Sequence, residues 1–224
     1  MAYYRDLTKI SIDDYKEILH SGDLLPSWQV LKEDIDKNMD IIKCQKIQNL
    51  EELKTALKDK AKVEIFSEQS GLSIDYLMVL RRVINGYHPK PNRIKDFPGT
   101  PTDIPTKLEA LGLKNTVQLY NEVLTPAKRK ELSLKTGIKE EDIMRLARLT
   151  DLSRIKWVNH TFAYVLMEAG YDSAGSVADA DYEKMYTSIK QLNREKEIYK
   201  GNIGANDMKR CVEAAQDLEL DVEY

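Results

Sequence analysis

One short segment spaces oxygen-bearing side chains in the way that begins a calcium-binding loop. In the run DIDKNMD these side chains are Asp34, Asp36, Asn38 and Asp40. A complete loop also needs a glycine at its sixth position and a bidentate glutamate at its twelfth, and this chain has Met39 and Gln45 there. We therefore interpret the segment as a solvated helix end and expect no metal site.

The other residues that could carry catalysis or hold a metal ion are scattered along the chain. The histidines and cysteines are His20, His88, His160, Cys44 and Cys211. None has a partner at metal-ligand spacing or belongs to a nucleophile motif. The adjacent Glu140 and Glu141 stand at the start of an expected helix, where carboxylates interact favourably with the helix dipole. The patterns predict a non-enzymatic protein without a metal, a cofactor or a small-molecule substrate, and an active site assembled from distant residues is the alternative.

The elements that must position any site are helices. Nearly every segment places apolar residues at helical spacing, and no run alternates apolar and polar residues long enough to predict a strand. Asn49 and Asn115 each stand three residues before a glutamate or glutamine that can reach back to the helix start, and Thr125 precedes Pro126. The sequence therefore predicts an all-α fold.

Residues 49–83 align without gaps on residues 115–149, which indicates an internal repeat. The identical pairs are Asn49/Asn115, Leu53/Leu119, Ala61/Ala127, Lys62/Lys128, Ser67/Ser133, Gly71/Gly137, Met78/Met144, Leu80/Leu146 and Arg82/Arg148. Each copy reads as two helices, a glycine turn that needs positive φ, and a third helix. A looser copy relates LEALGLKNTVQL, residues 108–119, to LMEAGYDSAGSV, residues 166–177. We expect the copies to pack on one another as helical hairpins in two subdomains.

Prolines mark the expected domain boundary. Five of the seven lie between Pro89 and Pro105 and interrupt helix continuity, so we place a hinge near Pro91. This gives an N-terminal helical domain, residues 1–90, with a divergent repeat copy, and a second domain, residues 91–224. The sequence starts without a basic and apolar leader pattern, and no run approaches the roughly 18 apolar residues of a membrane span. We expect a cytoplasmic protein without a membrane partner.

Charge is distributed unevenly along the chain. Residues 1–42 carry 5 basic and 9 acidic side chains, residues 43–165 carry 22 and 15, and residues 166–224 carry 7 and 13. A basic middle between acidic flanks is compatible with an anionic partner. Solvated helix faces are the alternative interpretation of the same pattern.

The stretch DFPGTPTDIPTKLEALGL, residues 96–113, reads as a turn before a short helix. In helix-hairpin-helix proteins a glycine, an apolar residue and a second glycine open a helix, and their backbone N–H groups face a nucleic-acid phosphate. Counting back nine residues from Leu108 and from Leu166 gives the corresponding positions in two turns. They are Gly99, Thr100 and Pro101 in the first turn and Trp157, Val158 and Asn159 in the second.

The second half of the chain also carries motifs of a known family. They are LEALGLKNTVQL, KRKELSLKTGIKEEDIMRLARLTDLSRIKWV, LMEAGYDSAGSVADAD and DMKRCVEAAQDL. The most specific is a T-G-I turn followed by a helix and D-L-x-R-I, here Thr136–Ile138 and Asp151–Ile155. From about Lys95 to Glu219 the chain resembles the bacterial helix-hairpin-helix-containing family of domains of unknown function numbered 4332. The resemblance implies a compact domain of helical hairpins with presumed nucleic-acid or protein binding and no established catalysis.

Both turns depart from the G-[IV]-G-P pattern of that family. Pro101 lacks an N–H, and Trp157 and Asn159 replace the two glycines of the second turn. The nucleic-acid hypothesis assigns backbone, charge or stacking roles to Gly99, Thr100, Lys107, Lys114, Arg145, Arg148, Arg154, Lys156, Trp157, Asn159 and His160. The alternative is a protein-interaction module in which Trp157 is an exposed anchor. A purely structural alternative pairs Arg154 with Asp151 and buries Trp157 in the core.

Overall fold

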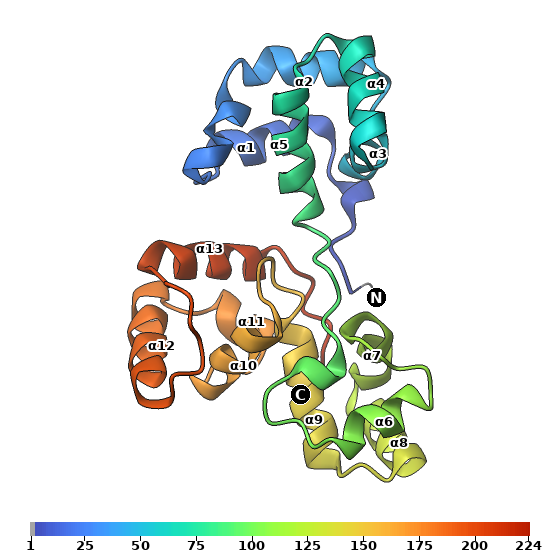
Figure 1. The fold of residues 1–224 in the computed structure, drawn as a ribbon, viewed down its shortest axis with the longest axis vertical. Helices are drawn as coiled ribbons and strands as arrows, with labels where there is room; N and C mark the ends of the chain where they lie inside the picture. The colour runs from blue at the N-terminus through green and yellow to red at the C-terminus, as the bar shows by residue number, and fades with distance from the viewer. Residues whose placement is uncertain (1–2) are drawn as a thin grey trace. The chain divides into compact units, whose positions relative to one another are not determined.

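The computed structural model describes residues 3–224, and all regular secondary structure within this range is helical (Figure 1). The all-α prediction is therefore confirmed. The chain divides into two compact units, one formed by Arg5–His88 and the other by Pro89–Tyr224 together with Tyr3 and Tyr4. Among the described residues, no helix is both long and apolar enough to cross a membrane.

The Arg5–His88 unit is built around one apolar core. Its elements are η1 (Leu7–Lys9), α1 (Ile12–Ser21), η2 (Pro26–Lys32), α2 (Ile35–Cys44), α3 (Leu50–Ala56), α4 (Lys60–Ser70) and α5 (Ile74–Asn85). Tyr15, Leu31, Met39, Leu53 and Leu77 are fully buried where these helices meet. Each helix thus buries one apolar face, as the helical spacing in the sequence predicts.

The second unit has two larger apolar cores that share one helix. Its elements are η3 (Ile94–Asp96), α6 (Asp103–Glu109), α7 (Thr116–Val123), α8 (Pro126–Thr136), α9 (Glu140–Leu152), α10 (His160–Glu168), α11 (Ala174–Ala178), α12 (Tyr182–Lys196) and α13 (Ala205–Gln216). Leu146 of α9 packs among α6, α7 and α8, whereas Leu149 and Leu152 pack among α10 to α13. Helix α9 therefore links the two halves of this unit.

The two gap-free segments of the predicted repeat have the same local structure. Helices α3, α4 and α5 correspond to α7, α8 and the first part of α9, and Gly71 and Gly137 follow α4 and α8 with φ of 75° and 65°. Asn49 and Asn115 cap their helices as predicted, at 3.0 and 3.1 Å from the N–H three residues later. Their partner side chains reach back one residue further than expected, to the N–H before the cap.

The correspondence extends to a pair of backbone bridges that the alignment did not include. In the first unit the Ile12 N–H donates to the Gln48 carbonyl at 3.2 Å, and Ser11 bridges Asn49. In the second unit the Ile94 N–H donates to the Lys114 carbonyl at 3.1 Å, and Arg93 bridges Asn115. The bridge brings residues 92–94 beside the start of α7.

The calcium-like segment lies at the start of α2. Asp34 precedes the helix with φ of 46°, Asp36 pairs with Lys16 at 3.2 Å, and Asp40 pairs with Lys43 at 3.1 Å. Within residues 3–224, no group of three or more His, Cys, Asp or Glu side chains is arranged to hold a metal ion.

Candidate functional site

Two turns of the second unit have the same backbone geometry. Gly99 has φ of 69° and Trp157 has φ of 70°, and each is followed by an N–H that closes the turn. The Thr100 N–H donates to the Phe97 carbonyl at 3.3 Å, and the Val158 N–H donates to the Ile155 carbonyl at 3.0 Å. These are the positions that counting back from Leu108 and Leu166 predicts. A non-glycine residue in this left-handed conformation costs roughly 1–2 kcal/mol, so Trp157 is held there by its surroundings.

Trp157 lines an open groove on the surface of this unit. Its exposed fraction is 48%, which excludes the structural alternative that placed it in the core. The groove has a volume of about 530 Å³ and is lined by Pro89, Lys90, Pro91, Asn92, Arg93, Asp96, Trp157, Val158, Asn159 and His160. The Lys156 ammonium lies over the indole, 4.6 Å from the ring centroid. The groove thus combines an exposed aromatic ring with several basic side chains.

The N-terminus of α10 forms one wall of the groove. The Asn159 side chain accepts from the Phe162 N–H at 2.9 Å, and the Asn92 side chain accepts from the His160 N–H at 3.1 Å. The backbone N–H groups of Asn159 and Thr161 have no partner among the described residues. This helix start therefore keeps two donors for an anion while two others are satisfied internally.

The first turn is less open to an anion. Pro101 has no N–H to offer, and the Asp103 carboxylate stands in the first turn of α6. The Lys107 ammonium, 2.8 Å from this carboxylate, and the nearby N–H groups of Asp103 and Ile104 lower the pKa of Asp103. The Asp103 carboxylate already interacts with the N–H groups at the start of α6, so a phosphate at this helix N-terminus would meet a negative charge.

Arg145 fastens the first turn from α9. Its Nη2 donates to the Pro98 carbonyl at 2.6 Å, and its Nη1 lies 3.5 Å from the Thr100 hydroxyl. A Cβ at Gly99 would lie 3.1 Å from Nη2, so a larger residue there would have to displace the guanidinium slightly as well as adopt positive φ. The guanidinium also lies 5.6 Å from the centroid of the Tyr164 ring. Arg145 thus contacts the first turn with both terminal nitrogens and stabilises it.

Two further predicted residues lie nearer the surface. Arg148 is half-buried, forms an ion pair with Asp172 and lies over the Tyr224 ring. Lys114 is exposed, and its backbone carbonyl accepts from Ile94, so it lies beside the groove-lining residue Arg93. Of these two cations, Lys114 is the one whose backbone lies beside the groove.

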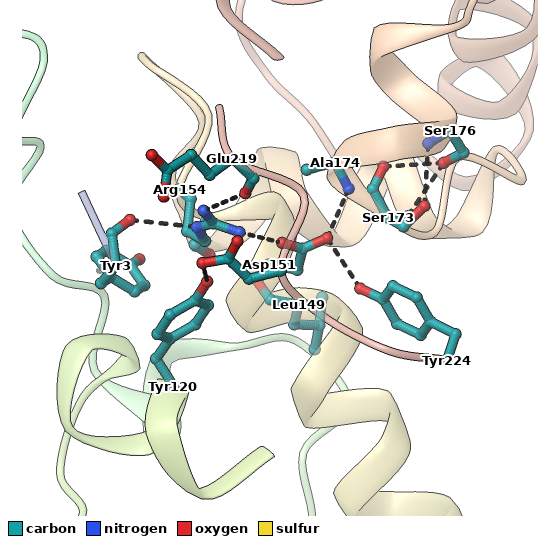
Figure 2. Close-up of polar contacts among 12 residues, drawn as sticks. Tyr3, Tyr120, Leu149, Asp151, Arg154, Ser173, Ala174, Ser176, Glu219 and Tyr224 are labelled. Atoms are coloured by element: carbon teal, nitrogen blue, oxygen red, sulfur yellow. Dashed lines mark hydrogen bonds and ion pairs between the residues drawn. The ribbon is translucent and has the colours of Figure 1, made fainter. Parts of the chain in front are cut away.

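Arg154 and Asp151 form a buried ion pair with no unused charge (Figure 2). The two side chains are 2.9 Å apart, and only 1% of the Arg154 side chain is exposed. The remaining nitrogens of Arg154 donate to the Tyr3 carbonyl at 3.2 Å and to the Glu219 carbonyl at 2.7 Å. Asp151 also accepts from the Ala174 N–H at 2.7 Å and from the Tyr224 hydroxyl at 2.9 Å. The pairing of Arg154 with Asp151 is confirmed, and its burial leaves no guanidinium surface for a phosphate.

A family model described as a domain of unknown function, DUF4332, matches residues 98–218, just over half of the chain. The chain belongs to this family. The prediction made from the T-G-I and D-L-x-R-I motifs is confirmed, and the DUF4332 match includes both turns and the Asp151–Arg154 pair. No curated protein and no solved structure matches the sequence.

Several residues around the DUF4332 turns were not predicted from the sequence. Lys90, Asn92 and Arg93 line the groove, although they precede the family match. Asn92 has a specific role because its side chain satisfies an N–H of α10, 68 residues away. Its neighbour Arg93 pairs with Asp96 at 3.0 Å. This pair has the same three-residue spacing as Asp151 and Arg154, but the basic residue comes first instead of the acidic one. That correspondence between the two turns was the one signal in the sequence that could have drawn attention to Arg93.

Proposed function

We propose that the second unit is a non-enzymatic binding module of helix-hairpin-helix type, and that it binds nucleic acid through its second hairpin. The observation that carries this proposal is the exposed Trp157, held at positive φ in the lining of a groove whose cations are Lys90 and Arg93. The two turns with matching φ support the assignment of hairpin repeats. The first hairpin serves as a joint that Arg145 holds in place.

The groove supplies the two kinds of contact that single-stranded nucleic acids need. A base stacked on an exposed aromatic ring contributes about 1–3 kcal/mol, and basic side chains follow the phosphates. Lys156 already lies on the Trp157 ring, so stacking of a base and binding of a phosphate would occur side by side. The free N–H groups of Asn159 and Thr161 provide an anion site at the start of α10. Lys114 adds positive charge next to Arg93.

Protein binding is the second candidate function, and two observations favour it. The start of α6 carries the Asp103 carboxylate and a proline without an N–H, so only one of the two hairpins is suited to a phosphate. An exposed tryptophan beside Pro89 and Pro91 is also a suitable anchor for a protein partner.

Binding of fluorescein-labelled single- and double-stranded DNA and RNA, measured by anisotropy at low salt and then over a salt titration, tests the proposal. We expect affinity for single strands to fall with rising salt, with a log–log slope of about −0.7 for each phosphate contact. Trp157→Ala should weaken binding by roughly 5- to 150-fold, the equivalent of one lost stacking contact. Leu134→Ala, at a site that is 79% exposed on α8, is the matched surface control and should leave affinity unchanged.

Trp157→Gly separates stacking from backbone strain. Glycine adopts positive φ without cost, so this variant should be as stable as wild type or more stable while binding as weakly as Trp157→Ala. Undetectable binding at low salt, or affinity that does not depend on salt, would refute the nucleic-acid proposal. Retention of a protein partner by wild type and its loss on Trp157→Ala would then favour the second candidate.

A further inference from the structure

Residues 219–224, which follow α13, have no regular secondary structure and contact the C-terminal ends of α7 and α9. Both ends of this 219–224 segment are held through the backbone. The Arg154 guanidinium donates to the Glu219 carbonyl at 2.7 Å, and the Glu223 N–H donates to the Leu124 carbonyl at 2.9 Å. Backbone contacts of this kind recognise an extended chain whatever its side chains are.

Three side chains of the segment make specific contacts with this surface. Val222 packs against the aromatic and aliphatic cluster of Tyr3, Tyr120 and Leu124. The Tyr120 hydroxyl lies 3.4 Å from the Asp221 carboxylate. Figure 2 shows the other end of the site, where the Tyr224 hydroxyl donates to the Asp151 carboxylate at 2.9 Å. These contacts select an acidic residue, a small apolar residue and a tyrosine in turn.

The receiving surface carries a buried arginine whose hydrogen bonds are only partly satisfied. Arg129 is 4% exposed, and its Nη1 donates to the Val123 carbonyl at 2.8 Å. Its Nη2 is buried without a hydrogen-bond partner, although Glu223 and Tyr224 are close enough to interact with it electrostatically. Arg148 lies over the Tyr224 ring at 5.6 Å. A buried guanidinium nitrogen without a partner is costly, so it indicates a surface suited to a more anionic occupant.

We infer that the surface formed by α7, the start of α8 and α9 is a recognition site for an extended acidic peptide, and that the 219–224 segment is its intramolecular ligand. Peptide fits the observations better than nucleic acid does, because two of the contacts are made to a peptide carbonyl and a peptide N–H. The inference does not depend on the groove at Trp157. An acidic segment of another protein with aspartate, valine and tyrosine at the same spacing would be the ligand in trans.

The test uses the full chain with a protease site inserted between Asp217 and Leu218. The folded chain is cleaved at this site, and gel filtration removes the released segment. A fluorescein-labelled peptide of sequence DLELDVEY, residues 217–224, is titrated and followed by anisotropy. We expect saturable binding to the cleaved chain and binding at least 100-fold weaker to the uncleaved chain, because the tethered segment competes at millimolar effective concentration. The peptide with Tyr224→Phe loses the hydrogen bond to Asp151 and should bind roughly tenfold more weakly.

Three results would overturn the inference. The first is a lack of saturable binding to a cleaved chain whose circular dichroism shows that it is still folded. The second is equal binding of a scrambled peptide. The third is that an oligonucleotide of equal charge displaces the peptide at a lower concentration than the unlabelled peptide does. The last would assign the surface to nucleic acid. If cleavage unfolds the unit, the same titration is made on the intact chain carrying Val222→Ser and Tyr224→Ala, which weakens the tethered ligand only. Failure of that variant to bind the wild-type peptide would equally refute the proposal.

Discussion

Replacing Arg154 with methionine should destabilise the second unit far more than the same replacement at Arg93. Both arginines belong to ion pairs of three-residue spacing in corresponding turns. The Arg154–Asp151 pair is buried, with exposed side-chain fractions of 1% and 3%, whereas the Arg93–Asp96 pair is much more exposed, with fractions of 66% and 30%. Arg154→Met leaves a buried carboxylate without its cation, which costs about 3–5 kcal/mol. Asp151 keeps the Ala174 N–H and the Tyr224 hydroxyl, so we expect the lower end, about 3 kcal/mol. Arg93→Met removes an exposed pair and should cost less than about 1 kcal/mol.

The assay is urea unfolding in a Trp28→Phe background, so that the fluorescence of Trp157, then the only tryptophan, reports on the second unit. A single-unit probe is needed because two compact units do not have to unfold in one transition. Equal losses of stability for the two variants, or a loss below about 1 kcal/mol for Arg154→Met, would show that the buried pair does not stabilise the fold as argued.

Three further predictions concern other parts of the chain. Burial lowers the pKa of His88 below its usual 6.5, and the Lys54 ammonium, 2.5 Å from its Nδ1, lowers that pKa further, while the hydrogen bond between Nε2 and the Arg5 carbonyl opposes the shift only in part. The unfolded state therefore binds the proton more readily, so the Tm of the Arg5–His88 unit should fall as pH is lowered through 6.5, and His88→Gln should flatten that dependence. Burial raises the pKa of the Cys211 thiol to about 12, whereas Cys44 is exposed, so iodoacetamide should label Cys44 first. Mass spectrometry of the labelled chain measures the order, and labelling of Cys211 before Cys44 in the folded chain would contradict its burial. Gly137→Ala meets no neighbouring atom and should cost only the roughly 1 kcal/mol of positive φ, whereas Gly99→Ala also meets Arg145 and should cost more in the same urea assay.

The features that the sequence predicted well depend on neighbouring residues. Asn49 and Asn115 cap their helices, and Gly71 and Gly137 end theirs, because each acts within one turn of its own position. The pairing of Asp151 with Arg154 belongs to the same class, since three residues separate them. Local chemistry of this kind can be predicted from a single sequence.

The features that the sequence did not predict depend on contacts between distant residues. Arg154 is buried because Tyr3 and Glu219, 151 and 65 residues away, supply carbonyls to its guanidinium. A basic side chain near a predicted hairpin therefore gave no local sign of being internal. Asn92 and Arg93 reach the groove because their segment bridges to Asn115 at the start of α7, and no periodic pattern specifies that pairing.

The buried pair also explains how a tryptophan is kept in a glycine conformation. Trp157 follows Arg154 by three residues, and Ile155 and Val158 on either side of it are buried. Arg154 and these apolar neighbours hold the backbone of the turn, and the indole is the part of the segment left at the surface. Under the proposed function, the indole would be held in the groove before a ligand binds. A site preorganised in this way loses little entropy on binding. Loosening the Asp151–Arg154 pair should therefore weaken nucleic-acid binding at Trp157, even though neither side chain can touch that ligand. Arg93→Met removes a cation from the groove, so it should lower the salt dependence of binding and leave stability nearly unchanged.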